Sequence, residues 1–420
     1  MNKKDLIILK GTFLHTPSAA SFTCHKEHYL VARQGRIVSL TPELPEKYAG
    51  APIADYSGHL LIPGFVDLHT HAAQFRQRGL GLDLPLLPWL ETYTFPEEQR
   101  FSSTAYAQEI YDAFASELLY QGTTRVVTWA TIHEESARLL CQALEKYGLS
   151  AYVGKVSMDC NCPEYLKEDT TQALENAESF LSSYVKGPLV RGIVTPRFAP
   201  TCSRELLQGL GQLAARYQMP VQSHLSENKE EIAWVNQLFP ERAGYHDVYD
   251  YYGLFGQMPT LMAHCVHLSE AALERMREKQ VFAVHCPDSN LNLGSGIMPA
   301  RRFLDAGVPV GLGSDVGAGH TFSMPQAIVR AVQLSKLAFL QDASQKPLTL
   351  SEAFYLATKG GGRFFGQVGS FEAGSELDAL VLQPARHLQT TSPVEQLQHF
   401  LYTQNAAAIT TRYIAGKQRS

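Results

Sequence analysis

Two histidines separated by one residue give the sequence its most specific chemical signal. His69 and His71 end an apolar run that begins at Pro63. On a β-strand, residues i and i+2 point to the same face, so both imidazoles could bind one metal ion. Histidine pairs are also common as polar residues in surface loops, and the pair alone does not decide between these interpretations.

Further ionisable residues stand where later strand-like segments end. They are His224, Glu227, His264 and Asp315. A divalent ion needs three or four nitrogen or oxygen ligands and an open position, where a bound water loses a proton near neutral pH. The predicted ligands are His69, His71, His224 and Asp315. Glu227 could move protons to and from a substrate, and His264 could orient the water or stabilise an oxyanion.

These side chains need a fold that brings strand ends together. From about residue 104 onward, helical periodicity alternates with short runs rich in Val, Ile and Ala, which is typical of βα units. The predicted strands are 61–69, 124–128, 150–158, 189–195, 221–224, 260–264, 281–285 and 308–313. The predicted helices are 106–120, 135–147, 170–184, 203–217, 227–238, 270–279 and 324–340. No glycine-rich nucleotide loop follows the first strand, so an α/β fold of the closed (β/α)8 TIM-like barrel type is favoured over an open, doubly wound sheet.

The two ends of the chain have a different pattern. Short alternating strands are predicted at 6–9, 29–32 and 36–39, and again at 379–382 and 409–413. Such short hairpins are marginal alone, so we expect them to pair into a small β-sandwich domain formed by both termini. The predicted domains are residues 1–60 plus 371–420 for the sandwich and 61–370 for the barrel.

Composition narrows the class of partner. The chain has 420 residues, 45% of them hydrophobic, and a net charge of −5, which disfavours nucleic acid. The apolar run 6–9 is too short for a signal peptide, and no stretch of roughly 18 apolar residues could span a membrane. Seven scattered cysteines fit reduced thiols. We therefore expect a cytoplasmic protein that does not contact membranes.

Other metal signals are weaker. A second metal ion would need an additional bridging ligand, and Lys155 is the one candidate for it. Arg197, after the fourth strand, carries a positive charge that would repel a second cation. The sequence therefore favours one metal ion. Cys160 and Cys162 have no partner pair and are interpreted as ordinary thiols. The remaining histidines near strand ends, His267 and His285, are interpreted as structural.

The histidine and aspartate series resembles the amidohydrolase superfamily of metal-dependent hydrolases over nearly the whole chain, including residues 374–379. Four rarer strings resemble, within that superfamily, the guanine deaminase family. They are HTHAAQ at 69–74, DLPLLPWL at 83–90 with YTFPE at 93–97, TPRF at 195–198, and QSHLSEN at 222–228. The chain departs from the family's pattern at Asp288 and in the loop 313–319.

The resemblance implies hydrolytic deamination of guanine to xanthine and ammonia. It implies one divalent metal per chain, zinc or alternatively iron, a water deprotonated by Asp315, and a ring nitrogen protonated by Glu227. It places the purine against Gln74, Arg197, Phe198, His71 and His224, with the 89–95 segment as a wall or lid and a contact in a homodimer. Two alternatives stay open: a deaminase or chlorohydrolase acting on another heterocycle, such as 8-oxoguanine, an adenosine derivative or a triazine, and a scaffold protein without catalysis.

Overall fold

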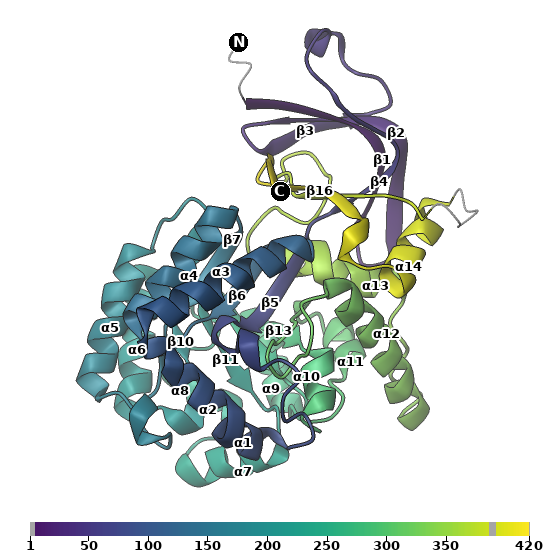
Figure 1. Ribbon diagram of the computed structural model, residues 1–420. Helices are drawn as coiled ribbons and strands as arrows, with labels where there is room; N and C mark the ends of the chain where they lie inside the picture. Colours follow the sequence, from purple (N-terminus) through teal and green to yellow (C-terminus); the bar gives the residue numbers. More distant parts are fainter. Residues whose placement is uncertain (1–4, 386–391, 420) are drawn as a thin grey trace.

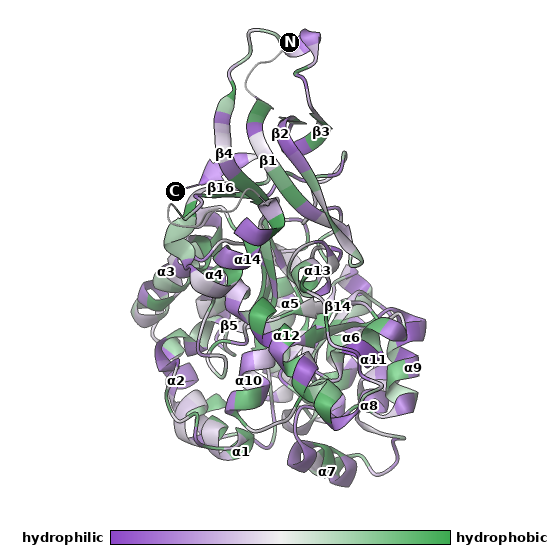
Figure 2. Cartoon of the chain, turned by 90° about the vertical axis from the view of Figure 1, so that its right-hand side faces the viewer, coloured by the Kyte–Doolittle hydropathy of each residue, from purple (hydrophilic) through white to green (hydrophobic). Residues whose placement is uncertain are grey.

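The computed structural model describes residues 5–385 and 392–419. A central group of parallel strands is surrounded by helices, and a second sheet, made from both ends of the chain, lies beyond one end of this group (Figure 1). Apolar residues run through the interior strands, whereas hydrophilic residues lie on outer helices such as α9 (Glu270–Lys279) (Figure 2). No helix within 5–385 or 392–419 is long and apolar enough to cross a membrane.

The central strands form two four-stranded parallel sheets and one short pair. The first sheet has the order β5 (Phe65–His71), β6 (Thr123–Trp129), β7 (Ser150–Gly154), β9 (Val190–Gly192). The second has the order β11 (Val221–Leu225), β12 (Thr260–His264), β13 (Phe282–His285), β14 (Val310–Leu312). The short strands β8 (Val156–Ser157) and β10 (Thr195–Pro196) pair with each other. Backbone hydrogen bonds join the two sheets at both edges, from Val194 N to Pro220 O (2.9 Å) and from Asp315 N to His69 O (2.8 Å).

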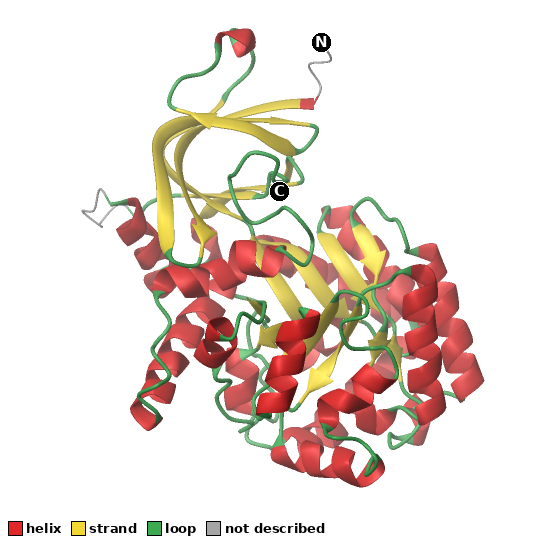
Figure 3. Cartoon of the chain, turned by 180° about the vertical axis from the view of Figure 1, so that it is seen from behind, coloured by secondary structure: helices red, strands yellow, loops and turns green. Residues whose placement is uncertain are grey.

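Helices cover the outside of these sheets (Figure 3). They are α3 (Thr104–Tyr120), α4 (Glu134–Tyr147), α5 (Thr170–Ser183), α6 (Arg204–Tyr217), α7 (Lys229–Leu238), α8 (Tyr245–Tyr251), α9, α10 (Pro287–Asn292), α11 (Ala300–Asp305), α12 (Met324–Gln341) and α13 (Leu350–Tyr355). In α4, Ala137, Leu140 and Leu144 recur at helical spacing and are buried, so this face packs inward. The helix ends at Gly148, whose φ of 69° favours a residue without a side chain.

The terminal sheet has seven strands drawn from both ends of the chain. Its order is β17 (Lys417–Arg419), β16 (Ile409–Ile414), β15 (Ala379–Leu382), β4 (Ala54–Pro63), β1 (Leu6–Ser18), β2 (Ser21–Arg33), β3 (Arg36–Thr41). Helix α14 (Pro393–Thr403) packs beside it. Its core includes Leu9, Phe13 and Leu61 from the N-terminal strands and Val381 and Tyr413 from the C-terminal strands.

The structure corrects several predicted strands. The prediction of one strand over 61–69 is wrong, because β4 ends at Pro63 and β5 begins at Phe65 in a different sheet. Between them a Cβ on Gly64 would lie 2.3 Å from the Thr124 side chain, so the crossing requires glycine. The predicted strands 150–158 and 189–195 are each broken in two, and the terminal strands β1 and β2 span 13 residues each rather than four.

A buried ion pair connects the terminal sheet to the central strands. The Arg125 guanidinium on β6 donates to both carboxylate oxygens of Asp378, at 2.6 and 3.0 Å, and to Glu376 at 2.8 Å. The Asp378 carboxylate also accepts from the backbone N of Ala415. Because the Arg125 and Asp378 side chains are only 5% and 1% exposed, each charge depends on the other for solvation.

Replacing Arg125 with alanine should therefore lower the free energy of unfolding by about 3–5 kcal/mol, since Asp378 would keep a buried, unpaired charge. Urea denaturation measures this. The control is Arg204→Ala, which removes an ion pair to Glu241 whose side chains are 49% and 41% exposed. That variant should lose less than about 1 kcal/mol. Equal losses in the two variants would show that the buried pair does not join the two parts of the chain.

Candidate active site

The predicted metal ligands, together with His264, which was predicted to orient the water or stabilise an oxyanion, converge at the carboxyl ends of the central strands. His69 and His71 end β5, His224 lies on β11, His264 ends β12, and Asp315 follows β14. His264 and Asp315 have left-handed backbones, with φ of 72° and 47°. Such conformations cost on the order of 1–3 kcal/mol and persist where the surroundings fix them, as these strand ends are fixed by the sheets.

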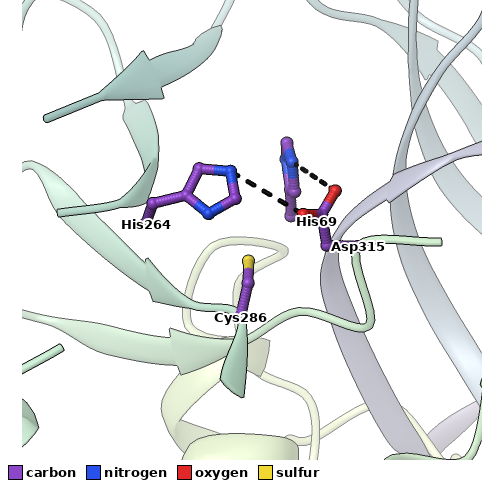
Figure 4. Close-up of side chains that lie close together, drawn as sticks. All are labelled: His69, His264, Cys286 and Asp315. Carbon is purple, nitrogen blue, oxygen red and sulfur yellow. Dashed lines mark ion pairs between the residues drawn. The ribbon is translucent and has the colours of Figure 1, made fainter. Parts of the chain in front are cut away.

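The ligand-type atoms lie close together. His69 Nε2 and His71 Nε2 are 3.2 and 3.4 Å from Asp315 Oδ1, and His264 Nε2 is 3.8 Å from Asp315 Oδ2. His71 Nε2 also faces His224 Nε2 at 3.4 Å. In Figure 4 dashed lines join both His69 and His264 to the carboxylate of Asp315.

The hydrogen bonds around these imidazoles fit a cation. His224 Nδ1 lies 2.7 Å from the carbonyl oxygen of Arg197, which only accepts, so Nδ1 carries the proton and the lone pair is on Nε2. That lone pair points toward His71 Nε2. His69 Nε2 is buried beside Asp315 Oδ1, at 3.2 Å, and makes no hydrogen bond of regular geometry with the described residues. Imidazole nitrogens and one carboxylate form a donor set that suits zinc or a similar divalent ion.

Burial keeps these groups in the protonation states that bind a metal. It lowers the pKa of His71 to about 4, and it also lowers the pKa values of His69 and His224. Burial would raise the pKa of Asp315, but the neighbouring His69 and His71 hold it well below its usual range. The imidazoles are therefore neutral and Asp315 is charged at neutral pH.

Cys286 is a member of this cluster that the sequence did not suggest. Its Sγ lies within 4.8 Å of ligand atoms of His69, His264 and Asp315 and points toward them (Figure 4). Burial raises the pKa of this thiol well above its ordinary value, so the group is a neutral thiol. The sequence offered one indication that Cys286 lies near the site, which is its position directly after His285 at the end of a predicted strand.

Glu227 lies beside the cluster, two residues before α7 begins. The predicted helix start at 227 is wrong, because Asn228 caps the helix together with Glu231. Glu227 accepts a hydrogen bond from Ser295 Oγ (3.0 Å), and its Oε2 is 3.5 Å from His264 Nε2. Burial and the charge of Asp315 raise the pKa of Glu227 to about 8, so this carboxyl holds a proton at neutral pH.

The cluster opens into a cavity. Its lining residues are His71, Gln74, Leu86, Trp89, Leu90, Arg197, Phe198, His224, Glu227, Glu231, His264, Leu293, Asp315 and Ala318. Apolar side chains form one part of this lining, and the histidine and aspartate cluster, Gln74 and Arg197 form the polar part. A concave pocket that combines apolar and aromatic side chains with convergent polar groups is typical of small-molecule sites.

One wall of the cavity comes from the segment predicted as a wall or lid. It consists of α1 (Leu86–Trp89), a π-helical turn (Leu90–Thr94) and α2 (Phe95–Gln99). Leu86, Trp89 and Leu90 face the cavity, and the Trp89 indole is fixed by donating to Leu80 O (3.0 Å). Single π-turns within helices are frequent at functional sites.

Gln74 and Arg197, which were predicted to bind the substrate, both line the cavity, and a third residue holds them. Glu98 of α2 accepts from Gln74 Nε2 at 3.0 Å and from Arg197 Nη1 at 2.5 Å. The Gln74 oxygen accepts from Gly317 N at 3.2 Å. Phe198 also lines the cavity, edge-on to Trp234. The carboxylate of Glu98 was missed because nothing in its local sequence distinguishes it from the neighbouring Glu97.

The weaker metal signals lie elsewhere. Lys155 forms a buried ion pair with Glu168 (2.5 Å), and His267 Nε2 lies 2.7 Å from the carbonyl of Ser295. His285 borders a different cavity, Asp288 accepts from Arg330 (2.9 Å), and neither lines the main cavity. Within 5–385 and 392–419, the candidate metal clusters contain neither Cys160 nor Cys162.

Comparison with known proteins agrees with this geometry. Residues 60–419 match the family model described as "Amidohydrolase family". The chain belongs to the amidohydrolase family. Within it, the chain is 40% identical to a guanine deaminase of Dictyostelium discoideum, over 87% of this chain and 84% of that one.

Solved structures of related enzymes have the same fold as this chain. The fold matches a guanine deaminase from C. acetobutylicum with bound guanine, with a TM-score of 0.98 and 46% identity, over 99% of this chain and 100% of that one. It also matches an adenosine deaminase from Xanthomonas campestris with bound zinc, with a TM-score of 0.81 and 26% identity, over 98% of this chain and 92% of that one.

Metal retention should change little between about pH 8 and 6 and should fall as the pH drops toward about 4. Protons compete for imidazoles only near their pKa, and burial holds that of His71 near 4. Dialysis of metal-loaded protein at each pH, followed by metal analysis, measures this; circular dichroism checks that the chain stays folded. Half of the metal lost by pH 6.5, with the fold intact, would contradict the neutral, buried histidines.

Proposed function

We propose that this chain hydrolyses guanine to xanthine and ammonia. The observation that carries the proposal is that one buried cavity holds the histidine and aspartate cluster, a proton-bearing Glu227 and a polar wall of Gln74 and Arg197. The similarity to guanine deaminases, one of them with guanine bound, supports the substrate.

We further propose that one divalent metal binds at this cluster. Its ligands would be His69, His71, His224 and Asp315. Such an ion, when bound, supplies a water that loses its proton near neutral pH. Zinc is the proposed metal, supported by the nitrogen and oxygen donor set and by the zinc-bound structure of the similar adenosine deaminase; iron is the alternative.

The chain's own residues then handle protons and charge. Asp315, ionised at neutral pH, accepts the proton of the attacking water. Glu227, protonated at neutral pH, donates to the ring nitrogen next to C2 as the water adds. His264 Nε2, close to both carboxylates, stabilises the oxygen that gains charge. Asp315 then passes the proton taken from the water to the amino group, the C2–N bond breaks and ammonia leaves, and Glu227 recovers a proton from the added hydroxyl as it becomes the C2 carbonyl.

Guanine would be bound by the polar wall and the rings around it. Gln74 and Arg197 would contact the lactam edge, where O6 accepts hydrogen bonds. Phe198 would lie against the purine face, and His71 and His224 would contact the ring beside the reacting carbon. The apolar side chains of the lining would shield the bound ring from bulk water.

We also propose how the chain is divided into two domains. The hydrogen bonds at both edges of the two central sheets support a closed (β/α)8 barrel over residues 61–370. The seven-stranded sheet supports a β-sandwich domain of residues 1–60 plus 371–420, although residues 1–4, 386–391 and 420 lie outside the described part of the chain.

A homodimer and a cytoplasmic location remain predictions. Leu337, Phe339 and Leu340 are exposed at the outer end of α12, and burying them would favour association with a second copy. All seven cysteines are free, which is consistent with a reducing compartment.

Glu227→Gln should lower kcat by about 10²- to 10⁴-fold, because an amide cannot donate and recover a proton as the carboxyl does. The metal content of this variant should equal that of the wild type. The matched control is His71→Ala, which should lose both metal and activity. Normal turnover by Glu227→Gln would exclude this residue as the proton donor.

The proposed reaction is tested by measuring metal content, guanine loss and ammonia release in one preparation of the wild type, with 8-oxoguanine, adenine and a chlorotriazine as comparison substrates. We expect about one metal per chain and a strong preference for guanine. If the protein binds metal but turns over a different substrate, the reaction on another heterocycle is favoured. If it binds no metal and turns over no substrate, the scaffold alternative is favoured.

A further inference from the structure

Glu98 lies behind the polar wall of the cavity and is not part of the reacting cluster. It is 1% exposed, and each of its two oxygens has a different partner. Oε1 accepts from Gln74 Nε2 and Oε2 accepts from Arg197 Nη1. The three residues come from separate places in the chain: the turn after β5, helix α2, and the end of β10.

The chemistry of its neighbours fixes the orientation of the Gln74 amide. A carboxylate only accepts hydrogen bonds, so the amide nitrogen must face Glu98. The backbone N–H of Gly317 only donates, so the amide oxygen must face Gly317. Gln74 cannot rotate by 180° without breaking both contacts, and it has one further N–H with which to contact a ligand.

Arg197 has only donors, and Glu98 holds it in place. Its guanidinium also lies 5.0 Å from the centre of the Phe95 ring, which comes from the same short helix as Glu98. A buried guanidinium without an anion would be strongly disfavoured, so the ion pair with Glu98 makes this position possible. The wall that Gln74 and Arg197 present to the cavity is therefore rich in N–H donors.

We propose that Glu98 is a positioning residue that sets substrate specificity by locking Gln74 and Arg197 as hydrogen-bond donors. This inference rests on the proposed function. A purine with an oxygen at position 6 offers the acceptor that this wall requires. A purine with an amino group at position 6 places a donor against donors, which leaves buried polar groups unpaired.

The test compares guanine with 2,6-diaminopurine, which keeps the reacting 2-amino group and replaces O6 with an amino donor. In Glu98→Gln the oxygen of the new amide can still accept from Arg197, but its NH2 then faces the NH2 of Gln74, so Gln74 loses one of the two contacts that fix its orientation. We expect KM for guanine to rise about 10- to 100-fold with kcat changed less than about threefold. The ratio of kcat/KM for guanine to that for 2,6-diaminopurine should fall at least about tenfold.

Glu168→Gln is the matched control for a merely structural effect. It breaks the Lys155–Glu168 pair, which has the same N–O distance of 2.5 Å and is buried to a similar degree, but does not line the cavity. Both variants should lower the melting temperature, and only Glu98→Gln should change KM and the substrate ratio. If Glu98→Gln does not fold, Glu98→Asp keeps the charge but is too short to reach both partners, and the same fall in the ratio is expected.

The outcomes separate this inference from the proposed function. Unchanged KM and substrate ratio in the Glu98 variants of an enzyme that turns over guanine would overturn the positioning role alone. The same shifts in Glu168→Gln would also overturn it, because they would then follow from lost stability. A wild-type protein that does not turn over guanine would overturn the proposed function and this inference together.

Discussion

The site depends on one constraint: several ionisable groups are buried together at the ends of parallel strands. Removing Asp315 from water is costly unless positive or hydrogen-bonding groups surround it, and His69 and His71 do so at 3.2 and 3.4 Å. Burial in turn favours the neutral imidazoles of His69, His71 and His224, and His71 Nε2 faces His224 Nε2 at 3.4 Å. A bound cation would lower the free-energy cost of burying these groups, because it would pair with the carboxylate and the imidazole nitrogens. The same burial therefore favours metal binding at this site.

Strand geometry makes that burial possible. Each strand of the central sheets contributes its last residues to the same end, and the left-handed turns at His264 and Asp315 aim their side chains into the cavity. The hydrogen bond from Asp315 N to His69 O ties the last central strand to the first. Distant parts of the sequence are thus fixed relative to one another by backbone hydrogen bonds, which are more rigid than contacts between loops.

The polar wall follows the same principle of paired burial. Glu98 carries no reacting group, yet its charge allows the Arg197 guanidinium to stay inside the protein and orients the Gln74 amide. The wall segment from Leu86 to Gln99 therefore does two things: its apolar side chains shape the cavity, and its one buried carboxylate connects it to the residues opposite. The ion pair of Arg125 with Asp378 has an equivalent role between the terminal sheet and the central strands.

The sequence by itself determined the residues that sit at strand ends and the alternation of strands and helices, because both depend on local periodicity and on residue type. From the sequence we predicted that His69, His71, His224, His264 and Asp315 lie at or just after strand ends. The predicted boundaries of β12, α9 and β15 are those of the structure. Only the tertiary structure decided the break at Gly64, the length of β1 and β2, and the neighbours Glu98 and Cys286 of the predicted site residues. These features come from contacts between segments far apart in the chain. A local sequence pattern does not indicate which distant residue a side chain will contact.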